Sequence, residues 1–182
     1  MNNIDLEKLR TEVLGFVKEM KVDNEKIWDY NLSKNTDSSI FTSCFALFIR
    51  YMFNDLTNLS HEEKTEWINY IQSFQSESTG YFTFEAKYTI GELHNQDHLN
   101  FQLGTFCVAA LNCLGVTSLY PFKYAEKYYD KATLFSYFES LDWNRSSNSG
   151  NKVMFMAISF IHNYESFGIK EAKKGLDYWF EW

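Results

Sequence analysis

The chain has 182 residues, of which 17 are basic and 24 acidic, so its formal net charge is −7. Hydrophobic residues make up 45% of the chain and aromatic residues 19%, which excludes a disordered polypeptide and indicates a large aromatic core, a stacking surface or both. The negative charge disfavours binding to nucleic acid or to an anionic membrane surface. One proline and eight glycines favour helices over a turn-rich β-fold.

The first residues of the chain and its cysteines indicate the cellular compartment. The first residues lack a basic stretch followed by an apolar run, so we predict no secretory signal. Residues 98–122 are free of Asp, Glu, Lys and Arg, but polar and helix-breaking residues interrupt them, so we predict no membrane span. The cysteines have no C-x-x-C spacing and lie in apolar runs, as buried free thiols do; they are Cys44, Cys107 and Cys113. These features favour a cytoplasmic location.

The hydrophobic pattern predicts one amphipathic helix at the N-terminus, with apolar positions from Ile4 to Met20, and then two kinds of helical segment that alternate. Uncharged or nearly uncharged segments, which we expect to be buried on all sides, are residues 39–53, 99–114 and 153–161. Amphipathic segments, which we expect to cover them, are residues 61–75, 124–141 and 168–182. We expect residues 21–38 and 76–98 to form loops or short turns.

Each buried segment is followed by an amphipathic one, which predicts three helical hairpins over residues 39–75, 99–141 and 150–182. No linker divides the chain, so we predict a single all-α domain over residues 1–182. Hairpins with inner and outer helices either close into a ring, the α/α toroid, or stack into an open solenoid. The strongly apolar inner segments favour the ring.

A short motif indicates a particular family more specifically than this periodicity does. Residues 70–82 read Tyr-Ile-Gln-Ser-Phe-Gln-Ser-Glu-Ser-Thr-Gly-Tyr-Phe, in which Gln75, Gly80 and Phe82 have fixed spacing. The segment resembles the repeat motif of terpenoid cyclases, with Phe82 in place of the usual Trp. The resemblance implies the α/α toroid that terpenoid cyclases share with protein prenyltransferases. We expect a structural role: Gln75 joins the end of an outer helix to the start of the next helix, Gly80 allows the αL turn that ends the outer helix, and Phe82 covers the junction.

The catalytic signatures of those families are absent from the chain: there is no Asp-x-Asp-Asp, no Asp-Asp-x-x-Asp and no prenyltransferase zinc trio. The same toroid also serves enzymes that act on carbohydrates, so the fold does not determine the function. Trp182 ends an amphipathic segment without a cap. We therefore expect the 182 residues to form about half of a toroid, which a partner chain or a further segment completes.

The strongest polar cluster precedes the second buried segment. His94 or His98 is a candidate acid or base with Asp97 assisting, and Asn100 and Gln102 are candidate ligand-binding residues. The alternative is that Asp97 or Asn100 caps the helix and that the histidines lie on the surface. Since His94, Asp97 and His98 offer at most three ligands, we predict no metal site, and we predict no cofactor.

The corresponding loop before the third buried segment suits a sugar, because a tryptophan can stack on the ring while polar side chains bond its hydroxyls. The candidates are Asp142, Trp143, Asn144, Asn148 and Asn151. The alternative is that this segment only ends one helix and caps the next, through Ser149 or Asn151. Arg50, the one charge in the first buried segment, either binds a carboxylate or phosphate in a cavity or pairs locally with Asp55.

These observations predict an α/α-toroid protein whose cavity binds or processes a glycan or another polar organic molecule. A terpenoid-cyclase-like or prenyltransferase-like protein is the second hypothesis, motivated by the motif around Gln75. A non-catalytic helical scaffold that holds a partner is the third. The sequence leaves the substrate, and whether there is a reaction at all, undetermined.

Overall fold

The computed structural model describes residues 5–83 and 96–182, and the side chains of these residues except 96–98. The described residues are all-helical: they contain no strand of a sheet and only two isolated β-bridges, Lys21 with Tyr30 and Gln75 with Phe82. The prediction of an all-α fold is confirmed, whereas closure into a toroid stays a prediction. No helix in the described part is long and apolar enough to cross a membrane.

The chain forms two compact units. Of the described residues, the first unit takes 5–74 and 109–116, and the second takes 75–83, 96–108 and 117–182. The helix α4 (Gln96–Cys113) contributes residues to both units.

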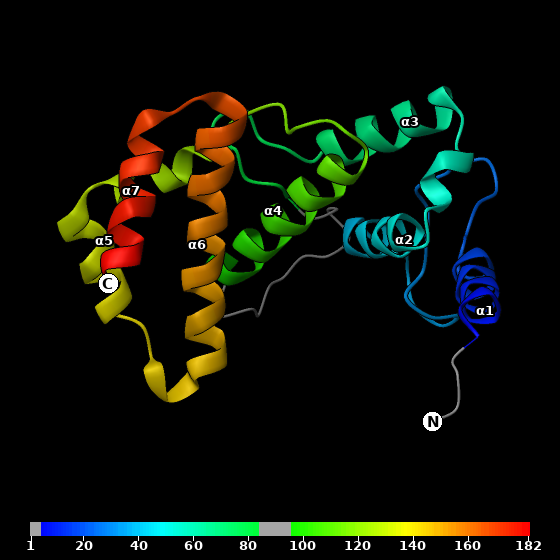
Figure 1. Ribbon diagram of the computed structural model, residues 1–182, viewed down its shortest axis with the longest axis horizontal. Helices are drawn as coiled ribbons and strands as arrows, with labels where there is room; N and C mark the ends of the chain where they lie inside the picture. The colour runs from blue at the N-terminus through cyan, green and yellow to red at the C-terminus, as the bar shows by residue number, and fades with distance from the viewer. Residues whose placement is uncertain (1–4, 84–95) are drawn as a thin grey trace. The chain divides into compact units, whose positions relative to one another are not determined.

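The first unit contains three α-helices and one 3-10 helix: α1 (Leu6–Glu19), α2 (Ile40–Met52), η1 (Asp55–Asn58) and α3 (His61–Gln72) (Figure 1). Side chains fix where these helices begin. Ser39 and Thr42 form a capping box at α2, and Ser60 and Glu63 form another at α3, so that free N–H groups of both first turns are satisfied.

Burial of apolar side chains joins α2 to α3. Leu47 and Ile71 are fully buried, and so is Trp67, whose Nε1 donates a hydrogen bond of 2.8 Å to Ser43 Oγ. However, the expectation that α2 is enclosed on all sides is wrong, because Phe45 is 37% exposed and Met52 76% exposed. The composition of a helix shows that it is apolar, but which faces have neighbours depends on the elements around it.

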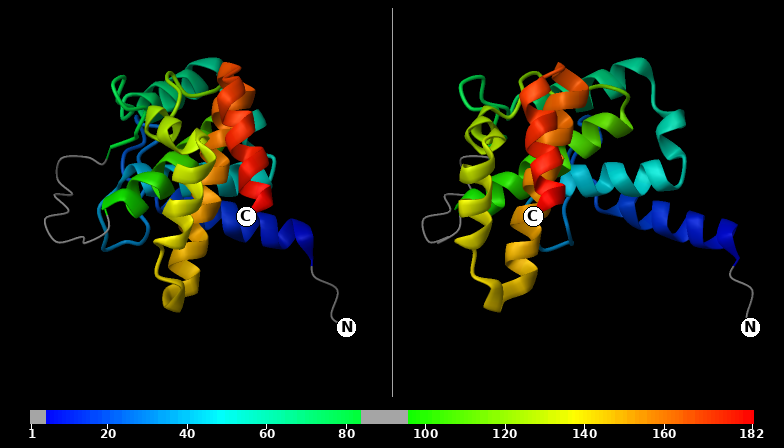
Figure 2. Two further views of the ribbon diagram at one scale, coloured as in Figure 1. Left: turned by 90° about the vertical axis from the view of Figure 1, so that its left-hand side faces the viewer. Right: turned by 60° about the vertical axis from the view of Figure 1, so that its left-hand side comes forward.

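The second unit contains η2 (Lys123–Tyr129), α5 (Lys131–Glu139), η3 (Trp143–Arg145), α6 (Ser146–Phe167) and α7 (Lys170–Glu181). The helices α6 and α7 lie side by side as a hairpin (Figures 1 and 2). Gly168 makes their connection with φ of 69°, a left-handed conformation that ends α6. The hairpin predicted over residues 150–182 is therefore confirmed.

Other predicted boundaries differ from the structure. The segment 124–141 is not one helix, because Asp130 leaves the helical conformation and caps α5 by accepting hydrogen bonds from the backbone N–H and the hydroxyl of Thr133. The helix α3 ends at Gln72, before Gln75. The helix α6 begins at Ser146, four residues before its predicted start.

Candidate functional site

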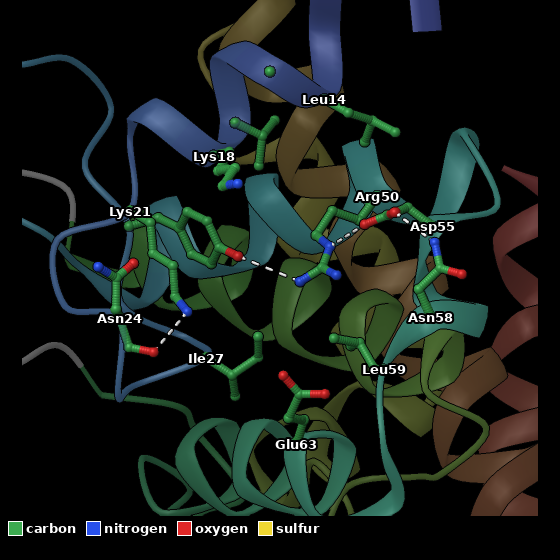
Figure 3. Close-up of a pocket in the computed structure, with 13 residues that line it drawn as sticks. Leu14, Lys18, Lys21, Asn24, Ile27, Arg50, Asp55, Asn58, Leu59 and Glu63 are labelled. Carbon is green, nitrogen blue, oxygen red and sulfur yellow. Dashed lines mark hydrogen bonds and ion pairs between the residues drawn. The ribbon is translucent and has the colours of Figure 1, made fainter. Parts of the chain in front are cut away.

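The first unit contains a cavity of about 430 Å³, a volume suited to a small organic molecule (Figure 3). It lies among α1, the loop after it, the end of α2, η1 and the start of α3. Its lining combines apolar, charged and amide side chains and consists of Leu14, Gly15, Val17, Lys18, Lys21, Asn24, Ile27, Tyr30, Arg50, Asp55, Asn58, Leu59 and Glu63.

Arg50 extends into this cavity from the last turn of α2 (Figure 3). Its Nε donates a 2.6 Å hydrogen bond to Asp55 Oδ2, and its Nη1 lies 3.4 Å from the Tyr30 hydroxyl. Its guanidinium also lies over the ring of Trp67, 5.8 Å from the centroid. The side chain is only 13% exposed. These contacts hold the guanidinium in one place and leave its outer N–H groups toward the cavity.

The local backbone explains how Asp55 reaches Arg50. Asn54, with φ of 55°, makes a left-handed turn after α2, and η1 begins at the next residue. Asn58, one turn further on, donates a 3.0 Å hydrogen bond to Asp55 Oδ1. The sequence-based alternative in which Arg50 pairs with Asp55 is thus confirmed, but the pair faces a cavity.

The charge states at the cavity follow from burial and from these contacts. Burial alone would raise the pKa of the Asp55 carboxyl, but the hydrogen bonds from Arg50 and Asn58 and the charge of Arg50 hold that pKa below its usual range. Burial raises the pKa of the Tyr30 hydroxyl, and Arg50 opposes that rise only in part. At neutral pH the cavity therefore contains a cationic Arg50, an anionic Asp55 and a neutral Tyr30.

The remaining charged groups at the cavity differ in whether their side chains already make hydrogen bonds. Lys21 Nζ donates a 3.1 Å hydrogen bond to the carbonyl of Asn24, and Glu63 Oε2 accepts a 2.8 Å hydrogen bond from the backbone N–H of Ser60. The side-chain ammonium of Lys18 makes no hydrogen bond or ion pair with any residue that the structure describes. The cavity can therefore offer an ammonium group and the free edge of a guanidinium to a ligand.

The predicted catalytic cluster lies mostly outside the described residues. His94 is outside them, and Asp97 and His98 lie in the first turn of α4 with side chains that are not described. Asn100 and Gln102 are half-buried on α4, within the second unit. Their assignment to a ligand stays a prediction. The described residues hold no group of three or more side chains that could bind a metal ion.

The predicted sugar-binding loop is mostly helical. Asp142 caps η3 by accepting from the backbone N–H of Asn144, and Trp143 Nε1 donates to the carbonyl of Phe138 at 3.0 Å. Trp143 is 41% exposed and stacks on Trp182 with 5.4 Å between centroids. Asn148 and Asn151 lie inside α6 rather than in a loop.

The expected cap at residues 149–151 is also wrong. The Ser149 hydroxyl donates to the carbonyl of Asp142 instead of accepting from the start of α6, and that helix has no side-chain cap.

Gln75 makes four hydrogen bonds in the second unit. Its Nε2 donates to the carbonyls of Gly80 and Tyr120 at 3.0 and 2.8 Å, and its Oε1 accepts from the backbone N–H groups of Leu119 and Tyr120 at 2.9 and 3.0 Å. A structural use of this amide was predicted. However, it joins the segment after α3 to residues 119–120, which precede η2, and not to the start of a helix.

Gly80 and Phe82 complete this junction. Gly80 has φ of 75°, the predicted left-handed conformation, but it lies in a turn eight residues after the end of α3 and does not end that helix. Phe82 is fully buried, forms a β-bridge with Gln75 and packs edge-on against Phe122, so it covers the turn that Gln75 makes rather than a junction between two helices.

A buried histidine in the second unit was not singled out from the sequence. His162 lies in the uncharged part of α6, with Nε2 2.8 Å from Ser118 Oγ and Nδ1 3.2 Å from Ser166 Oγ. The Ser118 hydroxyl also donates to the Tyr120 carbonyl, so Nε2 carries the proton and Nδ1 accepts from Ser166. Burial lowers the pKa of His162 to about 4, so this histidine is neutral at pH 7. A histidine in an otherwise apolar run was the signal for it.

Comparisons of this chain with models of protein families, with curated proteins and with solved structures find no match. The resemblance to terpenoid cyclases therefore rests on the motif around Gln75 alone.

Proposed function

We propose that this protein binds a small polar organic molecule carrying a carboxylate or a phosphate in the cavity of the first unit. The observation that carries the proposal is the placement of Arg50. Its guanidinium is largely buried, is held by Asp55 and Tyr30, and faces a cavity of about 430 Å³.

The geometry of Arg50 favours an anion as its ligand. Asp55 engages Nε on one edge of the guanidinium, so the end that carries Nη1 and Nη2 remains for a second acceptor, beside the Tyr30 hydroxyl 3.4 Å from Nη1. A planar guanidinium whose orientation is fixed binds a carboxylate or phosphate through two parallel hydrogen bonds, with little loss of side-chain entropy. Lys18 and Lys21 line the same cavity and add positive charge.

The rest of the lining favours a ligand with both polar and apolar faces. Leu14, Ile27 and Leu59 supply apolar surface, and the amides of Asn24 and Asn58 supply donors and acceptors. An acidic sugar, such as a uronic acid or a sugar phosphate, combines these properties. It also agrees with the sequence-based expectation of a glycan or another polar organic ligand.

Binding can be tested with a panel of ligands and two arginine variants. We expect uronic acids or sugar phosphates to bind in isothermal titration calorimetry, and the matching neutral sugars to bind at least about tenfold more weakly. Arg50→Lys keeps the charge but loses the planar fork, so we expect affinity to fall at least about tenfold. Arg145→Lys, at an exposed arginine of the second unit, is the matched control and should leave affinity unchanged. Equal affinity of wild type and Arg50→Lys would contradict the proposal.

Catalysis by His94 or His98 with Asp97 is a separate prediction. Replacement of both histidines by Ala should abolish turnover of any substrate that is found. Unchanged turnover would remove that assignment and leave the binding proposal intact.

The α/α toroid and the cyclase-like hypothesis are supported by the hairpin of α6 and α7 and by the buried contacts of Gln75 and Phe82. The same contacts would serve any helical-hairpin protein, so they favour the architecture more than the chemistry.

A further inference from the structure

Another hollow of the first unit is lined by α3 and by the loop that follows α1, and it is separate from the Arg50 cavity. It is an open groove of about 440 Å³ lined by Glu25, Lys26, Trp28, Glu66, Asn69 and Tyr70. None of these six residues lines the Arg50 cavity.

The base of this groove is an aromatic stack. The rings of Trp28 and Tyr70 are nearly parallel, at 6°, with 3.8 Å between their centroids. Phe74 packs edge-on against Tyr70 at 5.1 Å and supports it. Because Tyr70 covers one face of the indole, only the opposite face is open to a ligand.

That open face of Trp28 already attracts a positive charge. The ammonium of Lys26 lies over the indole, 5.5 Å from the ring centroid, and the contact with Tyr70 leaves only the open face for it. Lys26 is weakly held there, since its side chain is 52% exposed and its one ion pair, with Asp23, has an N–O distance of 3.9 Å. A cation that binds the indole more strongly than the Lys26 ammonium can therefore displace it with little loss of binding free energy.

Two carboxylates line the same groove. The side chains of Glu25 and Glu66 are exposed, and neither makes a hydrogen bond or ion pair within residues 5–83 and 96–182. The groove thus combines an indole face with two negative charges that have no partner. This combination recognises organic ammonium ions, because the ring attracts the cation through its π-face and the carboxylates balance its charge.

We propose that this groove binds a small organic ammonium ion, with Trp28 as its platform, Glu25 and Glu66 as its counter-charges and Lys26 as a built-in competitor. A quaternary ammonium group suits the site best, because it is weakly hydrated and spreads its charge over methyl groups that pack on the indole. A neutral sugar can also stack on tryptophan and donate hydroxyl hydrogen bonds to the carboxylates, but it would leave both negative charges unbalanced.

The competitor role of Lys26 makes the proposal testable with the full chain. Choline and tetramethylammonium are titrated and followed by NMR, and the uncharged isostere of choline, 3,3-dimethylbutan-1-ol, is the ligand control. We expect choline to bind and the isostere to bind at least about tenfold more weakly. Lys26→Met should strengthen choline binding about threefold or more. Lys34→Met removes the same charge from an exposed lysine that does not line the groove, and should have a smaller effect.

Two further variants separate loss of binding from loss of folding. Trp28→Leu should weaken choline binding at least about tenfold, and Glu25→Gln with Glu66→Gln should weaken it similarly while keeping the aromatic stack and the helical circular dichroism spectrum. Arg50→Lys should leave choline binding unchanged, so the groove and the Arg50 cavity can be tested separately. Binding of the isostere or of a neutral hexose as strong as that of choline, or weaker binding of choline to Lys26→Met, would overturn the proposal.

Discussion

Single residues decide whether a junction in this protein forms, and Gly80 is the clearest case. Its φ of 75° lies in the left-handed region, and a Cβ placed on it would collide with the carbonyl oxygen of Pro121. Gly168 has a similar φ of 69° but nothing within 4 Å of the equivalent position. Substitutions at the two glycines therefore distinguish the free-energy cost of backbone strain from the cost of a steric clash.

We expect Gly80→Ala to lower the free energy of unfolding by at least about 3 kcal/mol, because the strain adds to a clash with main chain that cannot move freely. Gly168→Ala should cost only about 1–2 kcal/mol, the strain alone. Urea unfolding of both variants measures the difference. Equal losses in the two variants would show that the contact between Gly80 and Pro121 is not tight in solution.

Arg50 shows how much of this site could be predicted from single residues of the sequence. The sequence placed one charge in an apolar segment and named Asp55 as its local partner, which is confirmed. A cavity beside Arg50 was the other alternative, but its lining by Tyr30 and Lys21 was not predicted, because these residues reach it only through the loop after α1. That loop is held by the bridge between Lys21 and Tyr30, and the hydrophobic pattern carries no sign of it.

At the scale of elements, buried polar groups fix α6 to the segment between α4 and η2. Asn163 Oδ1 accepts from the N–H of Phe122 at 2.7 Å, and its Nδ2 donates to the carbonyl of Phe122 at 3.0 Å. His162, next to it, contacts Ser118. Such a network stabilises the unit only while each member keeps the protonation state that its neighbours require.

His162 should therefore make stability depend on pH. Its pKa is about 4 in the folded chain and about 6.5 in the unfolded chain, so the unfolded chain binds more protons between these values. The free energy of unfolding should fall as pH drops from about 6.5 towards 4, by about 3 kcal/mol in total from this residue. Above pH 6.5 its contribution should be constant.

Chemical denaturation at pH 7 and pH 4.5 tests this expectation. His162→Gln should show a smaller loss of stability between the two pH values than the wild type. His61→Gln, at an exposed histidine that begins α3, should retain the wild-type loss. A pH dependence that is identical in wild type and His162→Gln would contradict the buried, neutral state of His162.

Elements were predicted best where the polypeptide itself marks their ends. The connection between α6 and α7 follows from a glycine after a long apolar run and before an amphipathic one. The segment 124–141 was predicted as one helix from the helical spacing of its apolar set, which lies wholly after Asp130: Leu134, Phe135, Phe138 and Leu141. The cap that Asp130 forms with Thr133 interrupts it, and periodicity alone does not distinguish an exposed aspartate from a cap.

At the scale of the whole molecule, the sequence predicted the helical class and the alternation of apolar and amphipathic segments. The exposure of Phe45 on α2 shows where such reasoning stops, because a helix can be apolar all round while one of its faces has no neighbour. Two of the hollows in the first unit differ in what they present: one presents a guanidinium, and the other an indole together with two carboxylates. A net charge of −7 favours approach of cations over anions, so an anion in the cavity depends on local contacts with Arg50.

The side-chain NMR signal of Arg50 Nε tests most directly whether anion binding in the cavity depends on Arg50. Titration of the full chain with a uronic acid or a sugar phosphate should shift this signal and the backbone signals of the cavity residues around Tyr30 and Asn58. In Arg50→Lys at the same ligand concentration, the backbone shifts should be largely lost. An unmoved Arg50 signal at saturating ligand, or backbone shifts that persist in Arg50→Lys, would contradict the account.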